Sequence, residues 1–424
     1  MHFYFALRKL NKPNQYRLKE GTYKMKKTLF SRKELLFITT LSFALGIRQM
    51  AMTLIMPFIS TYSKSLTYSS PVLAGVALGA FGLSQAIFQI PFGIWSDKIG
   101  NKPVMLCGLM QVIIGLIIGF FSKNIYMLIF SRALQGSGAV IAVGYSWISS
   151  SVGEKVRTKA LSIVGMIIGF AATISFVLGP LLHNILSVKQ MFLVCALLIL
   201  SVWTIILFSL KEDKNKIKKL EIDKEMHIMS VIKKLLQNRV FLILNLAAFL
   251  NNYIMTSVFY GIPQYLDKIT GINGMWKVFA PAVIIAIIFM RKTIKFVEKG
   301  FGSQLIIISF IITAIGIIFY FNKNSFLLIL VGSILFMTGY ICLATVIPSL
   351  ANDIAEDRYR GTTNGLLNSF QYIGSFVGAV ITGALWNNQE HLVLILLIAF
   401  ALLMAIFIKI FYKHILLTTK NEEN

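Results

Sequence analysis

Apolar runs of about 20 residues recur along this chain, and they constrain its fold more than any other feature. A helix of this length crosses the roughly 30 Å hydrocarbon core of a bilayer. The runs predict an all-α membrane protein whose twelve transmembrane helices form two six-helix, pseudo-symmetric halves. The predicted spans lie near residues 34–60, 72–95, 103–121, 126–151, 160–186, 190–210, 239–264, 278–290, 303–322, 326–350, 362–386 and 391–412.

The eighth span is the weakest of these predictions. Only about 13 apolar residues lie between Lys277 and Arg291, and a run this short is often not a membrane span. We retain it because its removal would move every later basic loop to the opposite side of the membrane.

The charged residues support this topology and exclude other protein classes. Charged residues make up 14% of the chain and hydrophobic residues 56%, whereas soluble proteins contain about 25% charged residues. A nucleic-acid-binding protein can be as basic as this chain, with its net charge of +24, but it would not carry these apolar runs. If the N-terminus is cytoplasmic, six of the 41 Lys and Arg residues lie in outer loops and two lie inside spans, which leaves 33 on the cytoplasmic side. This bias follows the positive-inside rule and predicts a multi-pass membrane protein with both termini cytoplasmic.

A long polar interruption after the sixth span divides the chain into two halves. We predict a basic N-terminal arm (1–33), a first six-helix half (34–210), a cytoplasmic linker (211–238), a second six-helix half (239–412) and a cytoplasmic tail (413–424).

The chain lacks the sequence signatures of enzymes and of metal or cofactor sites. It contains no phosphate-binding glycine loop, catalytic zinc motif or nucleophile elbow. A membrane-embedded enzyme would need catalytic acids or histidines clustered at one membrane face, and the five histidines are scattered. We therefore expect no enzyme activity, no cofactor and no metal. The lipid bilayer is an expected partner, nucleic acid is not, and we expect a monomer.

Three short motifs carry a family resemblance. The second and third spans are joined by Gly93-Ile-Trp-Ser-Asp97-Lys98-Ile-Gly100-Asn101-Lys102-Pro103, where glycines permit a tight turn and the charged side chains can bridge helix ends. This stretch resembles the loop-two/three signature of the major facilitator superfamily, with Asn101 in place of a usual base. Arg132-Ala-Leu-Gln135-Gly136 resembles the fourth-helix signature of the same superfamily. Gly179-Pro180 resembles the core of its drug-antiporter motif, although Leu182 and His183 stand where glycines are usual.

Together the motifs resemble the proton-linked drug-efflux branch of the superfamily. The resemblance implies the major facilitator fold and secondary active transport by alternating access, with proton-coupled efflux of a drug or metabolite. It thus implies a small-molecule substrate and protons as partners, and a bacterial inner membrane as the location. It also implies a role in proton transfer for Arg132. Similar members of the branch continue into a soluble C-terminal domain, but this chain ends soon after the twelfth span, so we expect no such domain.

Two arginines inside predicted spans are the strongest candidates for transport and coupling. An ionisable residue within the bilayer is costly and is a functional candidate by default. Arg48 lies near the middle of the first span. Arg132 lies in the fourth span and shares a helix face with Gln135.

No Asp or Glu lies well inside a predicted span, although many proton-coupled transporters carry a proton on an intramembrane carboxylate. Coupling would then use peripheral groups such as Asp97 or His183, or would not involve protons. Two arginines without acids also suit an anionic or neutral polar substrate better than a cationic drug. A uniporter or exchanger of a polar or anionic metabolite is therefore the alternative function.

The loop-two/three motif predicts a gate. Its candidate residues are Gly93, Asp97, Lys98, Gly100 and Lys102. The Asp97 carboxylate is expected near the N-terminus of the eleventh span, whose helix dipole is positive there. That contact would hold the two halves together at the cytoplasmic side.

Small residues and polar side chains complete the candidate set. Two small-xxx-small pairs occupy equivalent places in the two halves, where such spacing lets helices approach closely. The predicted packing residues are Gly165, Gly169, Gly179, Pro180, Gly374 and Gly378. The candidate substrate-binding residues, for which interhelical hydrogen bonding is an equally good explanation, are Gln49, Thr53, Gln85, Gln89, Asn251, Asn252, Tyr253, Gln371 and Tyr372.

Overall fold

The regular structure of the protein is helical wherever the chain is described. The computed structural model describes residues 30–212, 232–271, 274–297, 299–354 and 360–420. Within these ranges the only β pairing is an isolated bridge between Thr67 and Asn124.

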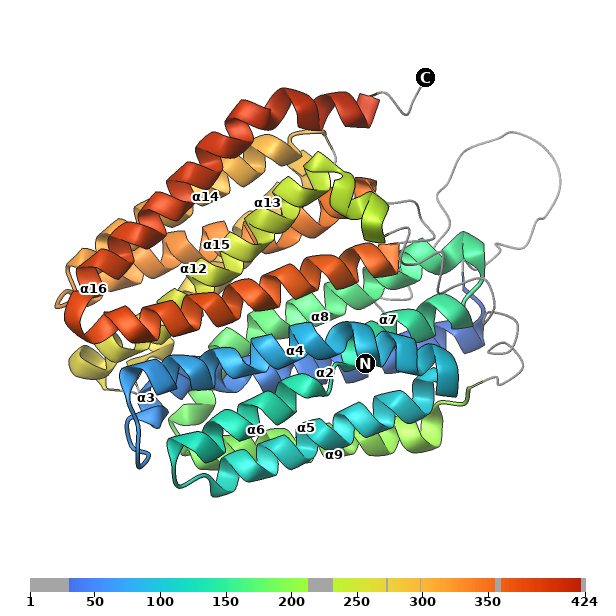
Figure 1. Cartoon of the computed structure of the whole chain (residues 1–424), viewed down its shortest axis with the longest axis horizontal. Helices are drawn as coiled ribbons and strands as arrows, with labels where there is room; N and C mark the ends of the chain where they lie inside the picture. The colour runs from blue at the N-terminus through green and yellow to red at the C-terminus, as the bar shows by residue number, and fades with distance from the viewer. Residues whose placement is uncertain (1–29, 213–231, 272–273, 298, 355–359, 421–424) are drawn as a thin grey trace.

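The helices fall into two groups that correspond to the two predicted halves (Figure 1). Those of the first half are α2 (Arg32–Ile55), η1 (Met56–Phe58), α3 (Ile59–Ser63), α4 (Pro71–Ile99), α5 (Asn101–Phe121), α6 (Ile125–Ser137), α7 (Val140–Ser151), α8 (Glu154–His183) and α9 (Val188–Ser209). Those of the second half are α12 (Arg239–Thr270), α13 (Trp276–Val297), α14 (Gly302–Ile318), η3 (Phe319–Phe321), α15 (Phe326–Ile354) and α16 (Arg360–Lys420).

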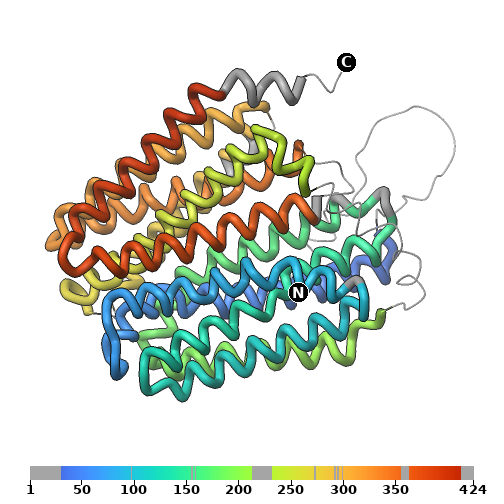
Figure 2. The backbone as a smooth tube through the Cα atoms, viewed as in Figure 1, coloured from blue at the N-terminus to red at the C-terminus, as the bar shows by residue number. Residues whose placement is uncertain are grey.

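Twelve membrane passes are accommodated by these helices. Ten described helical stretches are long and apolar enough to cross a membrane. The last of them, Thr362–Phe411, has 50 residues and bends at Gln389 (φ −143°, ψ 44°), so that α16 folds back and provides two passes (Figure 2). The shorter apolar stretch Trp276–Met290 provides the remaining pass.

Local sequence signals explain where several helices begin. The Ser31 hydroxyl accepts a hydrogen bond from the Glu34 amide, and the Glu34 carboxylate accepts one from the Ser31 amide. Ser187 and Gln190 form the same capping box at α9. At α12, the Asn238 side chain accepts hydrogen bonds from two backbone amides. Each cap satisfies amides that have no partner within the first helical turn.

The two ends of the helical bundle are distinguished here by their connections. We call the end at which α9 finishes and α12 begins the linker end, and the opposite end, where α3 is followed by α4 and α16 bends, the hairpin end (Figure 1). At the hairpin end, the Thr67 backbone bonds to Lys123 and Ile125.

The two halves pack closely against each other towards the hairpin end. Gly79 and Gly82 of α4 lie against α16: a Cβ at Gly79 would be 3.0 Å from the Phe376 Cα, and one at Gly82 would be 2.8 Å from the Tyr372 carbonyl oxygen. Closer to that end, the Tyr260 hydroxyl of α12 donates to the Pro71 carbonyl (2.9 Å). Glycine at these positions allows the helix backbones to approach without a side chain between them.

A stack of three phenylalanines also joins the halves in this region. Phe176 of α8 stacks on Phe259 of α12 with ring centroids 4.7 Å apart, and Phe259 stacks on Phe279 of α13 at 5.5 Å. Offset-stacked rings of this kind add stability beyond the apolar area that they bury.

The same interface is open towards the linker end. Gly93 lies 11 residues after Gly82, about three turns further along the same face of α4, and a Cβ there would meet nothing within 4 Å. Gly365, 11 residues before Phe376 in α16, has equally open surroundings. In Figure 1 the second-half helices diverge from the first half towards the linker end, in agreement with these surroundings.

Three predicted features differ in the structure. The motif predicted as a turn between spans two and three is mostly helical, because α4 continues to Ile99 and only Gly100 leaves the helix (φ 103°). The fourth span is two helices, α6 and α7, that break at Gly138. The eighth span is longer than its apolar run of 278–290, because α13 continues with polar residues to Val297.

Candidate functional site

Arg48 lies in the middle of the first span and is fully buried. It is the seventeenth residue of the 32-residue stretch Arg32–Ser63, and its side chain is 0% exposed. Its Nη2 donates to Gln85 Oε1 of α4 (2.6 Å) and weakly to the Gly138 carbonyl (3.5 Å). Gln85 Nε2 in turn donates to Gln89 Oε1 (3.2 Å). Arg48 therefore links α2 to α4 and to the break in the fourth span.

Arg132 occupies a second polar network within the same half. Its Nη1 donates to Gln135 Oε1 (2.7 Å), and Gln135 Nε2 donates to Ser131 Oγ (2.9 Å). Ser131 Oγ donates to the Gly115 carbonyl of α5 (2.7 Å). The predicted pairing of Arg132 with Gln135 on one helix face thus becomes a direct hydrogen bond, and the chain of bonds ties α6 to α5.

Phe81 of α4 brings the two arginines together. The Arg48 and Arg132 guanidinium carbons lie 5.5 and 5.0 Å from the centroid of its ring, within the range of a cation–π interaction. The ring also meets Tyr372 of the second half edge-to-face, with centroids 6.2 Å apart. Tyr372 is close enough to the Arg48 guanidinium for the two groups to interact electrostatically.

The positive charge at this site has no buried counter-charge in the described structure. Among residues whose side chains are described, Arg48 and Arg132 are the only charged ones that are buried. Arg48 Nε, Arg48 Nη1 and Arg132 Nε have no hydrogen-bond partner there. A buried charge without a counter-charge is costly: removing one partner of a buried ion pair typically destabilises a protein by about 3–5 kcal/mol. The site therefore has an unmet capacity to bind a negatively charged or polar group.

The break in the fourth span lies beside Arg48. Gly138 and Ala139 adopt ψ angles of 68° and 52°. The backbone turns tightly at these two residues, and Val140 N donates to the Gly138 carbonyl (2.8 Å). Gly108 of α5 packs against this turn, since a Cβ at Gly108 would be 2.6 Å from Val140. Irregular backbone at membrane depth is tolerated where protein surrounds it.

The gating motif holds together two helices of the first half. Glu212, just after α9, accepts hydrogen bonds from the Asn101 and Lys102 amides (2.6 and 3.0 Å) and from Asn101 Nδ2 (3.1 Å). Lys102 Nζ donates to the carbonyls of Leu207 and Leu210 (2.7 and 2.6 Å). The Glu212 carboxylate thus lies at the N-terminus of α5, and the Lys102 amine lies at the C-terminus of α9. These are the helix ends at which the helix dipole favours a negative and a positive charge, respectively. Asn101 contributes an amide donor where the family usually has a base.

The Asp97 latch stays a prediction. The Asp97 side chain and residues 355–359, which precede α16, lie outside the described part of the structure. Gly93 and Lys98 are part of α4, and Gly100 makes the turn into α5.

The predicted packing glycines behave differently in the two halves. Gly374 and Gly378 of α16 lie directly against the backbone of α12, where a Cβ would collide with the Phe249 and Tyr253 carbonyls. Gly169 of α8 has nothing within 4 Å, and Gly165 meets only the Tyr145 hydroxyl. The pair in α8 therefore does not mediate close helix packing in this conformation.

Gly179 and Pro180 lie at a close contact within the first half. A Cβ at Gly179 would be 2.6 Å from the Leu54 carbonyl, and Pro180 is buried inside α8.

The remaining polar candidates do not all join the arginine site. Gln49 Nε2 donates to Thr53 Oγ1 within α2 (3.2 Å), and Asn252 Nδ2 donates to the Ala248 carbonyl of its own helix (3.1 Å). Tyr253 packs edge-to-face on Phe400 in the last pass (5.4 Å). Asn251 is buried and Gln371 is partly exposed. The structure thus brings together Arg48, Gln85, Gln89 and Tyr372, and separates Tyr253 from them.

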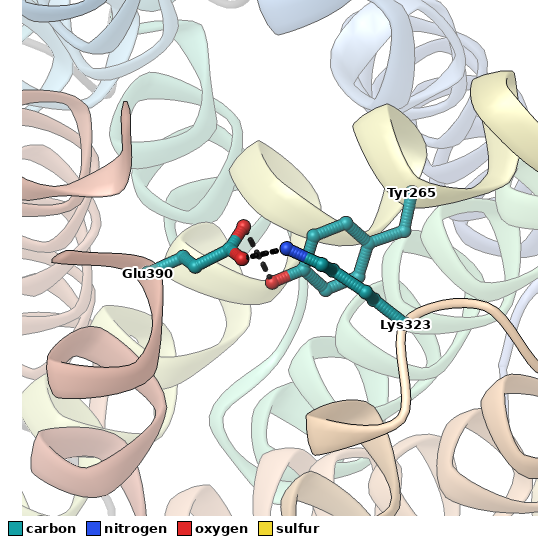
Figure 3. A network of polar contacts seen from close by, with 3 residues as sticks. All are labelled: Tyr265, Lys323 and Glu390. Atoms are coloured by element: carbon teal, nitrogen blue, oxygen red, sulfur yellow. Dashed lines mark hydrogen bonds and ion pairs between the residues drawn. The ribbon is translucent and has the colours of Figure 1, made fainter. Parts of the chain in front are cut away.

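A second charged cluster lies at the hairpin end of the second half. Glu390, next to the bend in α16, forms an ion pair with Lys323 and accepts a hydrogen bond from the Tyr265 hydroxyl (3.2 Å; Figure 3). Lys323 and Glu390 are 43% and 23% exposed. This cluster joins the hairpin-end parts of α12 and α16 and the residue that follows η3 and Asn322, and its charges are balanced.

Sequence reasoning did not identify several residues of these networks. Phe81 precedes Gln85 by four residues and so shares its helix face, a signal that could have identified it. Glu212 gives no such signal, because its hydrogen bonds depend on how α9 packs against α5.

Comparison with known proteins identifies the family. The profile of the Major Facilitator Superfamily matches residues 41–379. This chain belongs to the major facilitator superfamily. It is 30% identical over 346 residues to the inner membrane transport protein YajR of Escherichia coli. The aligned region covers 81% of this chain and 75% of that protein.

Two further similarities are more limited. Over 188 residues the chain is 29% identical to the class B tetracycline resistance protein of Escherichia coli, covering 44% of this chain and 45% of that protein. The crystal structure of a D-xylose–proton symporter has a TM-score of 0.69 at 16% identity and covers 88% of this chain and 97% of that one. The fold is the major facilitator fold, and the protein is a multi-pass membrane transporter, not an enzyme.

Proposed function

We propose that this transporter exports a small molecule by alternating access, in exchange for protons. The observation that supports alternating access best is the α4–α16 interface, which is closed near Gly79 and Gly82 and open at Gly93 and Gly365. Two halves in contact at one end only can rock about that contact and expose a central site to either side in turn.

The linker end is proposed to face the cytoplasm. Most of the 41 Lys and Arg residues lie at this end under the predicted topology, as the positive-inside rule requires. The conformation described here would then be open to the inside, with both termini cytoplasmic and a bacterial inner membrane as the location.

Proton coupling is supported by the resemblance to the drug-efflux branch and by the shared segment with a tetracycline resistance protein. An arginine stays protonated in proteins, so Arg132 would act by stabilising a nearby proton or charge and not by releasing its own proton. Asp97 and His183 are the candidates for carrying the proton. The His183 ring lies 4.6 Å from that of Phe58, and its Nδ1 is 3.0 Å from the Leu186 carbonyl oxygen.

A uniporter or proton-independent exchanger is the second candidate. One observation favours it: no carboxylate is buried among the side chains that are described. A proton-coupled carrier commonly uses such a group.

Reconstitution into proteoliposomes tests the coupling. We expect an imposed pH gradient to drive accumulation of at least one member of a panel of sugars, organic anions and lipophilic cations, and substrate addition to produce proton flux. Substrate uptake that is indifferent to the gradient would contradict proton coupling and support the second candidate.

Cysteine accessibility tests the rocking motion. In Gly93→Cys and Gly365→Cys, an impermeant maleimide should label the new thiols from the linker end, and conditions that drive transport should slow labelling at least threefold as the interface closes. Gly153→Cys is the matched control, because its site is also open and lies at the linker end, but outside the α4–α16 interface. Equal labelling of all three variants with and without transport would contradict the rocking motion.

A further inference from the structure

Arg48 has more unmet hydrogen-bonding capacity than any other buried side chain described in this protein. A guanidinium has five N–H donors, of which one is on Nε and two are on Nη1. Neither of these nitrogens has a hydrogen-bond partner among the described residues, so three donors are unused. Arg132, by comparison, uses Nη1 for Gln135 and leaves only Nε on the same list of unpartnered atoms.

The depth of Arg48 prevents it from reaching water at the membrane surface. It lies halfway along its span, and about 16 residues of helix, or about 24 Å, separate it from either end. A long side chain can extend its charge to the interface only from near a helix end. The full positive charge of Arg48 is therefore hydrogen-bonded, among the described residues, only to two neutral acceptors, Gln85 Oε1 and Gly138 O.

The surroundings of Arg48 include groups from both halves. Gln85 and Phe81 come from α4, whereas Tyr372 comes from α16 and packs its ring against that of Phe81. The Tyr372 backbone also lies beside Gly82, where the two halves are in contact. A ligand at Arg48 would therefore lie next to the surface that opens and closes in alternating access.

We propose that the Arg48 guanidinium binds the oxyanion group of the transported substrate, and that the Tyr372 hydroxyl donates to the same group from the second half. The substrate class is thus a small organic anion with a carboxylate or phosphate group. This inference rests on the proposed function, since it assigns the substrate of the same transport site.

Charge explains why an anion would assist the transport cycle. Arg48 and Arg132 repel each other across Phe81, and a bound anion would offset that repulsion while it bridges the two halves. Hydrogen bonds between a guanidinium and an oxyanion are about twice as strong as neutral ones, and the planar donor group matches the geometry of carboxylate and phosphate.

Thermal unfolding of the purified full-length protein with matched ligand pairs tests the proposal. The probes are benzoate with benzamide, succinate with succinamide, and glucose 6-phosphate with glucose. We expect at least one anion to raise Tm by about 3 °C at saturation, and its neutral counterpart to have no effect, because a ligand that binds only the folded state stabilises it. If no anion stabilises the protein more than its neutral counterpart does, the proposal is wrong.

Variants assign the effect to the contact. Arg48→Gln should abolish the anion-specific shift, and Arg48→Lys should weaken anion binding about tenfold, because lysine keeps the charge but loses the planar donors. Arg239→Gln is the matched control: it removes the same charge from an exposed site at the start of α12 and should keep the full shift. An equal loss in Arg132→Gln and Arg48→Gln would indicate a general positive field and would overturn a specific contact with Arg48.

A further variant keeps the test decisive if Arg48→Gln fails to fold. Tyr372→Phe removes only a hydroxyl and should raise the apparent Kd for the anion by about tenfold or more, as expected for one hydrogen bond to a charged group. An unchanged Kd in Tyr372→Phe would remove the second half from the proposed site.

The outcome is separable from that of the proposed function. Anion-specific binding without any proton flux would retain this proposal and contradict proton-coupled export. Proton-coupled transport of a cation or a sugar, without anion-specific binding, would retain the proposed function and overturn this proposal.

Discussion

The charges of the first half and those of the second half are arranged in opposite ways. Arg48 and Arg132 are buried in the middle of the first half, side by side on one phenylalanine ring. Lys323 and Glu390 lie at the hairpin end of the second half, where each has an opposite charge and partial access to solvent. The second pair neutralises itself, whereas the first pair concentrates like charge away from water.

The difference separates groups that stabilise the fold from groups that are available for function. An exposed ion pair contributes about 0–1 kcal/mol and carries no unmet charge. Buried like charges are unfavourable for folding, which is why we propose a role in transport for Arg48 and Arg132. Glu212 is intermediate, because its carboxylate is partly buried and is satisfied by helix-end amides.

The largest expected effect on stability is at Phe81, whose ring contacts the guanidinium groups of both Arg48 and Arg132. Phe81→Leu removes two cation–π interactions, each about 2 kcal/mol when desolvated, so we expect a loss of about 4 kcal/mol in the free energy of unfolding. Thermal or denaturant unfolding in detergent measures this loss. Phe81→Tyr keeps the ring and should retain most of the stability. An equal loss in both variants would contradict the cation–π contribution, because Phe81→Tyr retains the aromatic ring.

A smaller effect is expected at Glu212. Glu212→Gln keeps an acceptor for the Asn101 and Lys102 amides but removes the negative charge from the N-terminus of α5, which we expect to destabilise the protein by about 1 kcal/mol. Asp267→Asn, which neutralises an exposed carboxylate in the last turn of α12, is the control and should change the midpoint of unfolding less. If the two variants have the same effect, the helix-end contact contributes nothing.

The smallest effect is expected at the Lys323–Glu390 pair. Because Lys323 is 43% exposed, Glu390→Gln should cost less than about 1 kcal/mol at low salt, and this difference should disappear at about 1 M salt. A double-mutant cycle with Lys323→Met measures the pairwise energy. A coupling energy above about 2 kcal/mol would show that this pair is as important for the fold as the buried networks, and would remove the contrast between the halves.

Much of the fold followed from hydropathy and charge pattern. The weak eighth span is present as the Trp276–Met290 stretch of α13. The two arginines inside predicted spans are the two charged residues that are buried among the side chains that the structure describes. Hydropathy could not reveal the break at Gly138, because the residues around it are as apolar or small as those of an unbroken helix. The sequence also did not predict that α4 stays helical to Ile99, because the last turns of this helix are polar and indicate a loop.

The sequence by itself determined that the chain has twelve membrane spans, because the bilayer imposes a length and an apolarity on every span. The major facilitator fold was implied by the resemblance of its short motifs to those of the superfamily. It also identified Arg48 and Arg132 as exceptions, because a charge in an apolar run is visible without a structure. Only the tertiary structure decided that both arginines share Phe81, that Tyr372 approaches from the other half, and that the glycines of α4 are in contact at one end and open at the other. These relations join residues on different helices, and helix packing in lipid depends on close-range shape and hydrogen bonding, which hydropathy does not record.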